Sequence, residues 1–273
     1  MSSIALLSGL YNREKTKPKE KLRLIFSILI AVLAVILAAE IVFHFVISPR
    51  LRLSKVEITA GEGVSLSNAE ILKLAGLKGD ETFFAVDEAV IAERIGAFAP
   101  VRSVTVERVF PNMLKIGITE REPLGISLLE VDGRSVPVIL DEEGVVFQIG
   151  SSVSMFDLPV LSGFTFKDVE LGQRVNRALL SFFQDLHSLR SSSEALYSLI
   201  SELEFVKKER AGFEVLLFPR DYRVAVRIGS QIDVDIMRRI LLVLDVFATQ
   251  GTISTIEEID FRTGTPLVRF KEE

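Results

Sequence analysis

Few side chains in this sequence are of the types that carry out chemistry. The chain has no cysteine and only two histidines, His44 and His187. The lack of cysteine excludes disulfide scaffolds, cysteine-ligated zinc, iron–sulfur clusters and thiol nucleophiles, and two histidines are too few for a His-rich metal site. His187 lies near the end of a predicted helix, where it could act as a general base, but a surface or helix-capping role is favoured.

Two glycine-containing segments resemble ligand-binding motifs without completing them. Gly61-Glu62-Gly63 lies between a predicted strand and a predicted helix, but Leu66 occupies the third glycine position of a dinucleotide fingerprint, so we predict a simple turn. Asp141-Glu142-Glu143-Gly144 has three consecutive carboxylates, which a tight turn directs apart, so we interpret it as a solvated turn rather than a cation site. We therefore predict no catalytic residue, metal, cofactor or small-molecule substrate.

Charge and hydropathy indicate a membrane protein. The 273-residue chain has a net charge of −5 and a pI near 5.4, which disfavours nucleic-acid binding. Its mean hydropathy of +0.37 is high for a soluble protein. Residues 24–47 contain only Glu40 and His44 as ionisable side chains, and as a helix they would extend about 36 Å, enough to cross a hydrocarbon core of about 30 Å. The run is too long for a cleaved signal peptide, so we predict a retained transmembrane helix.

The flanking charges predict the orientation of this helix. Residues 1–23 form a basic tail with six Lys or Arg and two Glu, whereas only Arg50, Arg52 and Lys55 follow the span closely. The positive-inside bias places the N-terminus in the cytoplasm and residues 48–273 outside it, so the chain would cross the cytoplasmic (inner) membrane once.

Glu40 and His44 form a polar pair on one face of the span, four residues apart and toward its outer end. One interpretation is that both side chains reach out to interfacial water and partly satisfy each other. A contact with a partner helix is a second interpretation, and proton transport a third, although one span alone does not build a transport pathway.

Hydrophobic periodicity predicts two domains beyond the span, at residues 53–122 and 123–271. The first domain has the predicted order β-α-α-β-β. Its first helix has the S-x-x-E capping box of Ser67 and Glu70. The second helix carries Val90, Ile91 and Ile95 on one face. The predicted elements are a strand Leu53–Thr59, a helix Asn68–Ala75, a helix from about Asp87 to before Pro100, and strands Ser103–Val109 and Met113–Glu120.

The second domain reads as a mainly antiparallel sheet with at least two helices, so the predicted fold class is α+β. The predicted strands are Ile126–Val131, Val136–Leu140, Val145–Ile149, Leu203–Lys207, Phe213–Phe218, Tyr222–Ile228, Ile256–Phe261 and Pro266–Phe270, and the predicted helices are Gly172–Leu189 and Asp233–Thr249. The last strand would leave an apolar sheet edge that accepts an extended segment of another protein by strand addition. The alternatives are that this strand is interior to the sheet, or that Pro266 and the charged residues after Phe270 protect it.

A series of short motifs runs through residues 20–271 in a fixed order. They are Val56-x-Ile58, Phe83-Phe84-x-Val86-Asp87, Pro100-Val101, Val106-x-Arg108-x-Phe110-Pro111-Asn112-x-Leu114, Glu120-Arg121-x-Pro123, Val138-Ile139-Leu140-Asp141-x-x-Gly144-Val145-Val146-Phe147, Leu158-Pro159-Val160-Leu161-Ser162-Gly163 and Ile259-Asp260-Phe261-Arg262. In these motifs the sequence resembles the FtsQ/DivIB family of bacterial division proteins, in which a POTRA domain precedes a β domain.

The resemblance implies a non-enzymatic, bitopic divisome protein concentrated at the division septum. It implies a POTRA domain that helps recruitment and a β domain that binds FtsB/DivIC-like and FtsL-like partners by strand addition at the last strand and by contacts with the preceding helix. The residues implied at that interface are Arg262, Thr263, Leu267, Val268 and Phe270. The family often has an aromatic residue after the arginine, where this chain has Thr263.

Two other functional classes remain open at this point. POTRA domains also occur in membrane proteins of envelope protein assembly or secretion, but those precede a long β-barrel series that this chain lacks. A membrane-anchored cell-wall hydrolase is the second rival, and the sequence offers no site for it.

Overall fold

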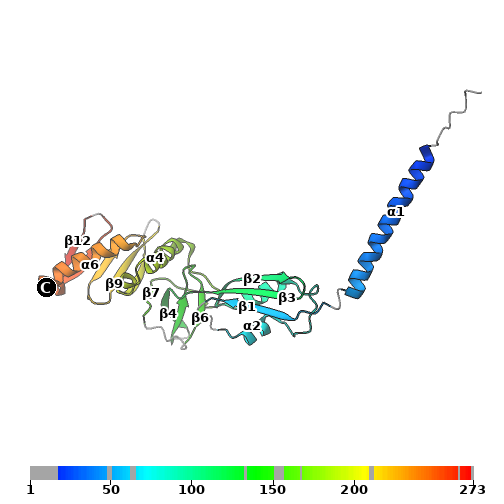
Figure 1. Ribbon diagram of the computed structural model, residues 1–273. Helices are drawn as coiled ribbons and strands as arrows, with labels where there is room; N and C mark the ends of the chain where they lie inside the picture. Colours follow the sequence, from blue (N-terminus) through cyan, green and yellow to red (C-terminus); the bar gives the residue numbers. More distant parts are fainter. Residues whose placement is uncertain are drawn as a thin grey trace, which may run out of the picture.

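The computed structural model describes residues 18–47, 51–61, 66–131, 134–150, 157–166, 168–208, 212–263 and 265–271. Figure 1 shows an extended molecule in which helix α1, a three-stranded sheet and a nine-stranded sheet follow one another, with the C-terminus at the end far from α1. Most of the predicted basic tail, the Asp132-Gly133 turn and the larger part of the Gly61–Gly63 turn lie outside the described residues.

Helix α1 (Pro18–Val42) continues as a short π-helix, η1 (Phe43–Ile47). Its stretch Leu22–Val46 is long and apolar enough to cross a membrane, and its side chains are exposed. Glu40 and His44 are both exposed, and within the described residues no hydrogen bond or ion pair joins them. This helix is consistent with the span of a single-pass membrane protein, while the role of the polar pair stays a prediction.

The three-stranded sheet has the strand order β1-β3-β2, with β1 parallel and β2 antiparallel to the central strand β3. The predicted β-α-α-β-β order is confirmed. The bounds are β1 Lys55–Ala60, α2 Asn68–Ala75, α3 Glu88–Gly96, β2 Val101–Val109 and β3 Met113–Glu120. The capping box at α2 is also confirmed: the Ser67 amide donates to Glu70 Oε2 at 2.9 Å, and the Ser67 hydroxyl oxygen accepts from the Glu70 amide.

The core of this sheet lies between its strands and the two helices. Ile91 and Ile95 of α3 are buried as predicted, and so are Leu114 and Ile116 of β3. The prediction that Val90 lies on the same buried face as Ile91 and Ile95 was wrong, because Val90 is 36% exposed. A helix turns about 100° per residue, so the neighbour of a buried residue easily faces solvent.

The nine-stranded sheet has the order β12-β11-β10-β9-β8-β7-β4-β5-β6. It is mainly antiparallel as predicted, although β4–β7, β7–β8 and β10–β11 are parallel pairs. The strands are β4 Gly125–Val131, β5 Arg134–Leu140, β6 Val146–Ile149, β7 Val160–Ser162, β8 Ile200–Lys207, β9 Phe213–Pro219, β10 Ala225–Ile228, β11 Ile256–Asp260 and β12 Leu267–Phe270. The helices are η3 Arg177–Leu179, α4 Leu180–Ser192, α5 Glu194–Tyr197, α6 Val234–Thr249 and η4 Ile253–Thr255.

Packed aromatic rings fill the centre of this second core. Phe182 and Phe183 of α4 are fully buried, and Phe183 stacks on Phe205 of β8 with ring centroids 5.9 Å apart. The helix predicted from Gly172 begins later, at η3 and α4. Gly172 has a φ of +85°, and its amide donates to the Val146 carbonyl at 2.7 Å, so this segment pairs with β6 instead of starting the helix. Strand β7 and helix α5 were not predicted.

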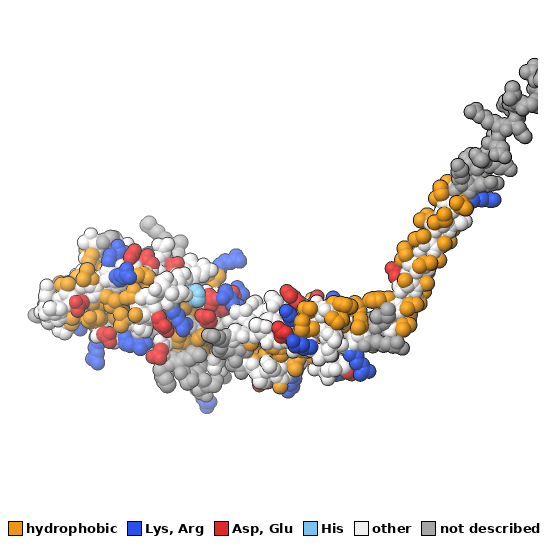
Figure 2. All heavy atoms as spheres, in the orientation of Figure 1, with side chains coloured by type: hydrophobic (Ala, Val, Ile, Leu, Met, Phe, Trp, Pro, Cys, Tyr) orange, Lys and Arg blue, Asp and Glu red, His pale blue; other side chains and the backbone are white. Residues whose placement is uncertain are grey.

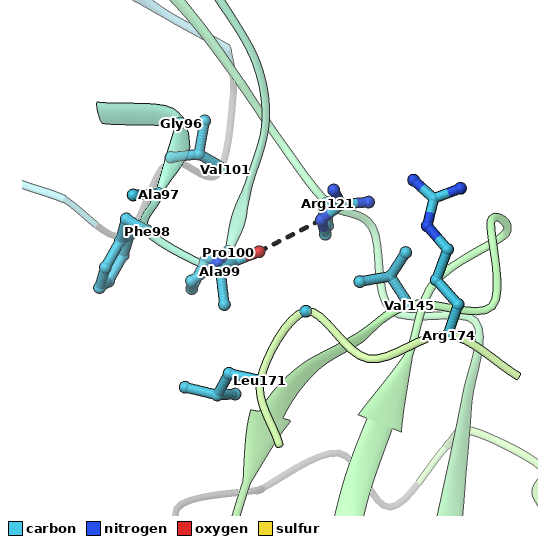
Figure 3. A pocket seen from close by; sticks show the side chains of 11 residues that line it. Gly96, Ala97, Phe98, Ala99, Pro100, Val101, Arg121, Val145, Leu171 and Arg174 are labelled. Carbon is cyan, nitrogen blue, oxygen red and sulfur yellow. Dashed lines mark hydrogen bonds between the residues drawn. The ribbon is translucent and has the colours of Figure 1, made fainter. Parts of the chain in front are cut away.

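The two sheets are joined by a buried arginine–carboxylate pair. Arg121 follows β3 directly, and its amide and Nε donate to the carbonyls of Pro100 and Ala99 at 2.8 and 3.2 Å. Its Nη1 lies 2.5 Å from Asp141 Oδ2, in the turn after β5. Figure 3 shows Arg121 between the segment of Ala99 and Pro100 on one side and Val145 on the other. The hydrogen bonds of Arg121 thus hold the end of the first sheet against the start of the second.

The turn that contains Asp141 is a further correction, because it is not solvated. Asp141 is 0% exposed and its Oδ1 accepts the Val145 amide at 2.7 Å. Glu142 is 7% exposed and bonds Arg102 of β2 at 2.5 Å. Burial raises the pKa of the Asp141 carboxyl, against the opposing effects of the Val145 amide and the Arg121 guanidinium. The three carboxylates therefore help to hold the two sheets together. Sequence reasoning missed this role because their arginine partners are remote in the chain.

Replacing Arg121 by Met tests the join. The change leaves the Asp141 carboxylate buried without its charge partner, which costs about 3–5 kcal/mol of unfolding free energy. Arg174→Met is the matched control, because the Arg174 side chain is 57% exposed and bonds Glu143 at 3.2 Å; we expect a loss below about 1 kcal/mol. Chemical denaturation of the full chain in detergent measures both values, and equal losses would contradict a special role for Arg121.

Candidate partner-binding edge

Strand β12 is the end strand of the nine-stranded sheet. It pairs antiparallel with β11, with Asp260 opposite Leu267 and Ile259 opposite Val268, and no further strand follows it in the described part of the chain. The alternative that this strand is interior to the sheet is therefore excluded for the described residues. Its outer edge offers backbone groups that another strand could pair with.

The side chains of β12 are unusually exposed for apolar residues. Leu267 is 61% and Phe270 is 54% exposed, whereas Val268 is half-buried and packs on the core of the nine-stranded sheet. Side chains alternate between the two faces of a strand, so Val268 and Phe270 share one face and Leu267 lies on the other. The strand thus has one anchoring side chain and apolar surface on both faces.

Arg262 and Thr263 lie in the turn between β11 and β12. The Arg262 Nη2 is 2.6 Å from Asp260 Oδ2, and its Nη1 donates to Glu214 Oε2 at 2.7 Å. The two carboxylates raise the pKa of the Arg262 guanidinium, so it stays charged. Thr263 is exposed, and its hydroxyl donates to the Thr265 carbonyl at 3.1 Å. Both residues shape the turn that positions β12.

A chain of alternating charges continues from Arg262 across the neighbouring strands. Arg227 of β10 bonds Glu214 of β9, and its Nε donates to Glu258 of β11 at 2.5 Å. Arg269 of β12 also reaches Glu258, at 3.0 Å. The bonds from Arg227, then the attraction of Arg269, hold the pKa of the Glu258 carboxyl below its usual range. These pairs tie the end strand to three strands of the sheet interior.

The network lines a surface hollow of 370 Å³. Three of the sequence-predicted residues line it, namely Arg262, Leu267 and Val268, while Thr263 and Phe270 lie outside it. The charged side chains in its lining are three arginines and three carboxylates that neutralise one another. No group of residues in the described chain has the composition of a metal site. The hollow therefore suits packing and hydrogen bonding to a polypeptide better than the capture of a small ion.

The helix before the last strand, α6, also carries exposed apolar residues. Leu242 and Val246 of α6 are 66% and 45% exposed. Figure 2 shows hydrophobic side chains gathered at the C-terminal end of the molecule, where Figure 1 places α6 and β12. The sequence already indicated exposed apolar residues on α6, since this helix carries apolar residues on more of its surface than one buried face needs. We call Leu267 and Phe270, the exposed apolar residues of β12, the terminal apolar surface.

The Glu258 pair gives a pH dependence with a defined sign. The folded pKa of Glu258 lies below the ordinary value of 4.5, so the pair stabilises the fold above that pH, and the stabilisation is lost as pH falls through the folded pKa. At about pH 7, Glu258→Gln should lower the free energy of unfolding by about 1.5–3 kcal/mol, the range for a hydrogen bond to a charged group. Denaturation of the full chain in detergent measures the cost, and its difference from wild type should shrink in acid. A difference that does not change with pH would contradict this pairing.

Comparison with known proteins relates the chain to cell division proteins. The family described as "POTRA domain, FtsQ-type" matches residues 51–121. The chain is 28% identical over 211 residues to the cell division protein FtsQ of Geotalea daltonii, covering 77% of this chain and 72% of that protein. It is 26% identical over 181 residues to FtsQ of a Geobacter species, covering 66% and 62%.

A relative from a different bacterial group bears the second family name. The cell division protein DivIB of Staphylococcus aureus is 28% identical over 120 residues, which is 44% of this chain and 26% of that protein. The FtsQ-type POTRA match coincides with the three-stranded sheet, and the longer similarities reach beyond it. Residues 51–121 match the FtsQ-type POTRA domain, and over as much as 77% of its length the chain is similar to cell division proteins named FtsQ or DivIB.

Proposed function

We propose that this protein is a non-enzymatic, bitopic member of the divisome that binds small membrane-anchored division proteins through the outer edge of β12. The observation that carries the proposal is the exposed end strand itself, with Leu267 and Phe270 at 61% and 54% exposure. The partners we propose are FtsB/DivIC-like and FtsL-like. The alternating charges around Arg227 support this proposal, because they hold the edge in place before a partner arrives.

The backbone of β12 suits strand addition. The Lys271 amide donates to the Thr255 carbonyl at 2.9 Å, on the side of β11. Successive residues of a strand direct their amides to opposite edges, so the Phe270 amide faces outward. A partner strand would take up this outward-facing backbone, and the terminal apolar surface would give it specificity.

The position of this edge constrains the partner. Figure 1 places β12 at the end of the molecule far from α1. A partner anchored in the same membrane must therefore extend along the molecule to β12 before its segment pairs there. Ordering that segment uses part of the interaction energy, and attachment to one membrane compensates through a high effective concentration.

The other parts of the chain have separate proposed roles. We assign residues 1–23 to the cytoplasm, 24–47 to the cytoplasmic membrane, 53–122 to the POTRA domain and 123–271 to the β domain. The POTRA domain would recruit the protein to other division components at the septum. The positive charge before the span supports this orientation.

Replacing Phe270 by Lys tests the proposed edge. The full chain in detergent should capture an FtsB/DivIC-like protein from membranes of the source cell, and Phe270→Lys should weaken that capture at least about tenfold, the effect expected of a central apolar contact. Leu128→Lys is the matched control, because Leu128 is 57% exposed but lies on β4, away from β12 in the strand order.

The pattern of capture separates the parts of the proposal. Loss in Phe270→Lys but not in Leu128→Lys supports both the division partner and the edge. Equal capture by all three proteins keeps the partner but rejects the edge. Capture of secretion substrates in place of division proteins, also after crosslinking, rejects the divisome proposal.

A further inference from the structure

The end of the POTRA domain nearest to the span is built from three chain segments. Just after the span, the Leu51 carbonyl accepts the Phe83 amide at 2.8 Å, and the Leu53 amide donates to the Glu81 carbonyl at 2.9 Å. The Ser54 amide donates to the Asn112 carbonyl at 3.0 Å, in the turn between β2 and β3. The loop of Phe83 and the β2–β3 turn therefore lie beside the first residues that leave the membrane.

The length of chain fixes how far this end can be from the bilayer. The π-helix ends at Ile47, and Leu51 is already bonded to the POTRA domain. Four residues reach at most about 14 Å, since an extended chain spans about 3.3–3.6 Å per residue. This limit holds for any tilt of the span. The three segments therefore stay close to the membrane surface from which the span emerges.

Aromatic side chains are exposed at this end. Phe84 is 41% and Phe110 is 70% exposed, and both rings contact the buried Phe83, with centroids 5.2 and 6.1 Å apart. Phe84 also contacts Phe43 of the span at 5.5 Å. Figure 2 shows hydrophobic side chains continuing from the lower end of α1 onto the adjoining part of the molecule. We call Phe83, Phe84 and Phe110 the aromatic tip.

Basic side chains accompany the aromatic tip. Arg108 lies over the Phe83 ring, 5.9 Å from its centroid, and bonds Glu88 at 3.0 Å. Arg52 is exposed and pairs with Thr82 through a β-bridge. Aromatic rings with arginines beside them are the composition of a protein surface at the level of lipid headgroups.

We propose that the aromatic tip binds the surface of the lipid bilayer, in the leaflet from which the span emerges, and holds the POTRA domain against the membrane. The continuity of Phe84 with Phe43 of the span identifies lipid as the occupant, because a ring that touches the end of the span lies at the bilayer interface. Phe110 and Phe84 enter the headgroup region, and Arg52 meets phosphate. The POTRA domain then keeps one face toward the membrane and does not rotate freely about the residues that connect it to the span.

A tryptophan placed at Phe110 reports directly on this contact. The chain contains no tryptophan, so a single introduced one dominates the emission. The full chain is placed in nanodiscs of phosphatidylcholine and phosphatidylglycerol, with and without bromine on the acyl chains near the headgroup. Phe110→Trp should be strongly quenched by the brominated lipid and blue-shifted. Because Phe110 is 70% exposed, the change should leave the fold intact, which circular dichroism checks.

Two further variants are the positive and the negative control for quenching by the brominated lipid. Leu33→Trp, in the middle of the span, should be quenched and shows that the helix is inserted. Leu242→Trp, on α6 and 66% exposed, should keep its full emission.

The outcomes decide between lipid and other occupants. Quenching of Phe110→Trp close to that of Leu33→Trp supports the proposal. Emission as bright as that of Leu242→Trp overturns it. Protection from aqueous acrylamide without quenching by bromine also overturns it, because the ring would then be covered by protein. A result of either kind leaves the capture experiment on Phe270 unaffected.

Discussion

The ion pair between Arg121 and Asp141 is the contact on which the arrangement of the two sheets depends. Asp141 is 0% exposed, so its charge is stable only beside the guanidinium and the amides that bond it. Arg121 in turn holds the Ala99 and Pro100 carbonyls. One side chain therefore connects the last strand of the POTRA domain, the segment before β2 and the turn after β5 of the nine-stranded sheet. The arrangement of the two sheets has little freedom to vary, because moving one sheet relative to the other would leave the buried Asp141 charge unpaired.

A fixed join has a consequence for function. Helix α1 lies at one end of the molecule and β12 at the other, as Figure 1 shows. With the sheets held together, the distance between the POTRA domain and the proposed partner-binding edge is set by the fold. The proposed contact of the aromatic tip would add a second restraint, by fixing the POTRA domain to the bilayer surface. Together the two restraints would present the proposed edge at a defined distance and direction to partners anchored in the same membrane.

The accuracy of sequence reasoning varied with the range of the interactions involved. The helix Asn68–Ala75 and the strand Met113–Glu120 were predicted with the bounds that the structure has, because a capping box and a strict apolar alternation are local signals. The helix predicted from Gly172 failed where a local pattern met a distant partner, since the Gly172 amide bonds Val146 of β6. Strand β7 was missed because three residues carry almost no periodic signal. The partner-binding residues predicted by resemblance remain proposals, and the structure shows that Leu242 and Val246 of α6 are exposed as well.

The sequence by itself determined the apolar span, the capped helices, the alternating strands and the resemblance to the division family. Each of these depends on the spacing of residues within one short segment. Only the tertiary structure decided that Asp141 and Glu142 are buried, that β12 is the end strand, and that Phe84 and Phe110 meet Phe83 beside the span. These features depend on strand pairing and on charge partners that are remote in the chain. A carboxylate or a phenylalanine has the same local pattern whether it faces water, another side chain or lipid, and only the folded chain distinguishes these surroundings.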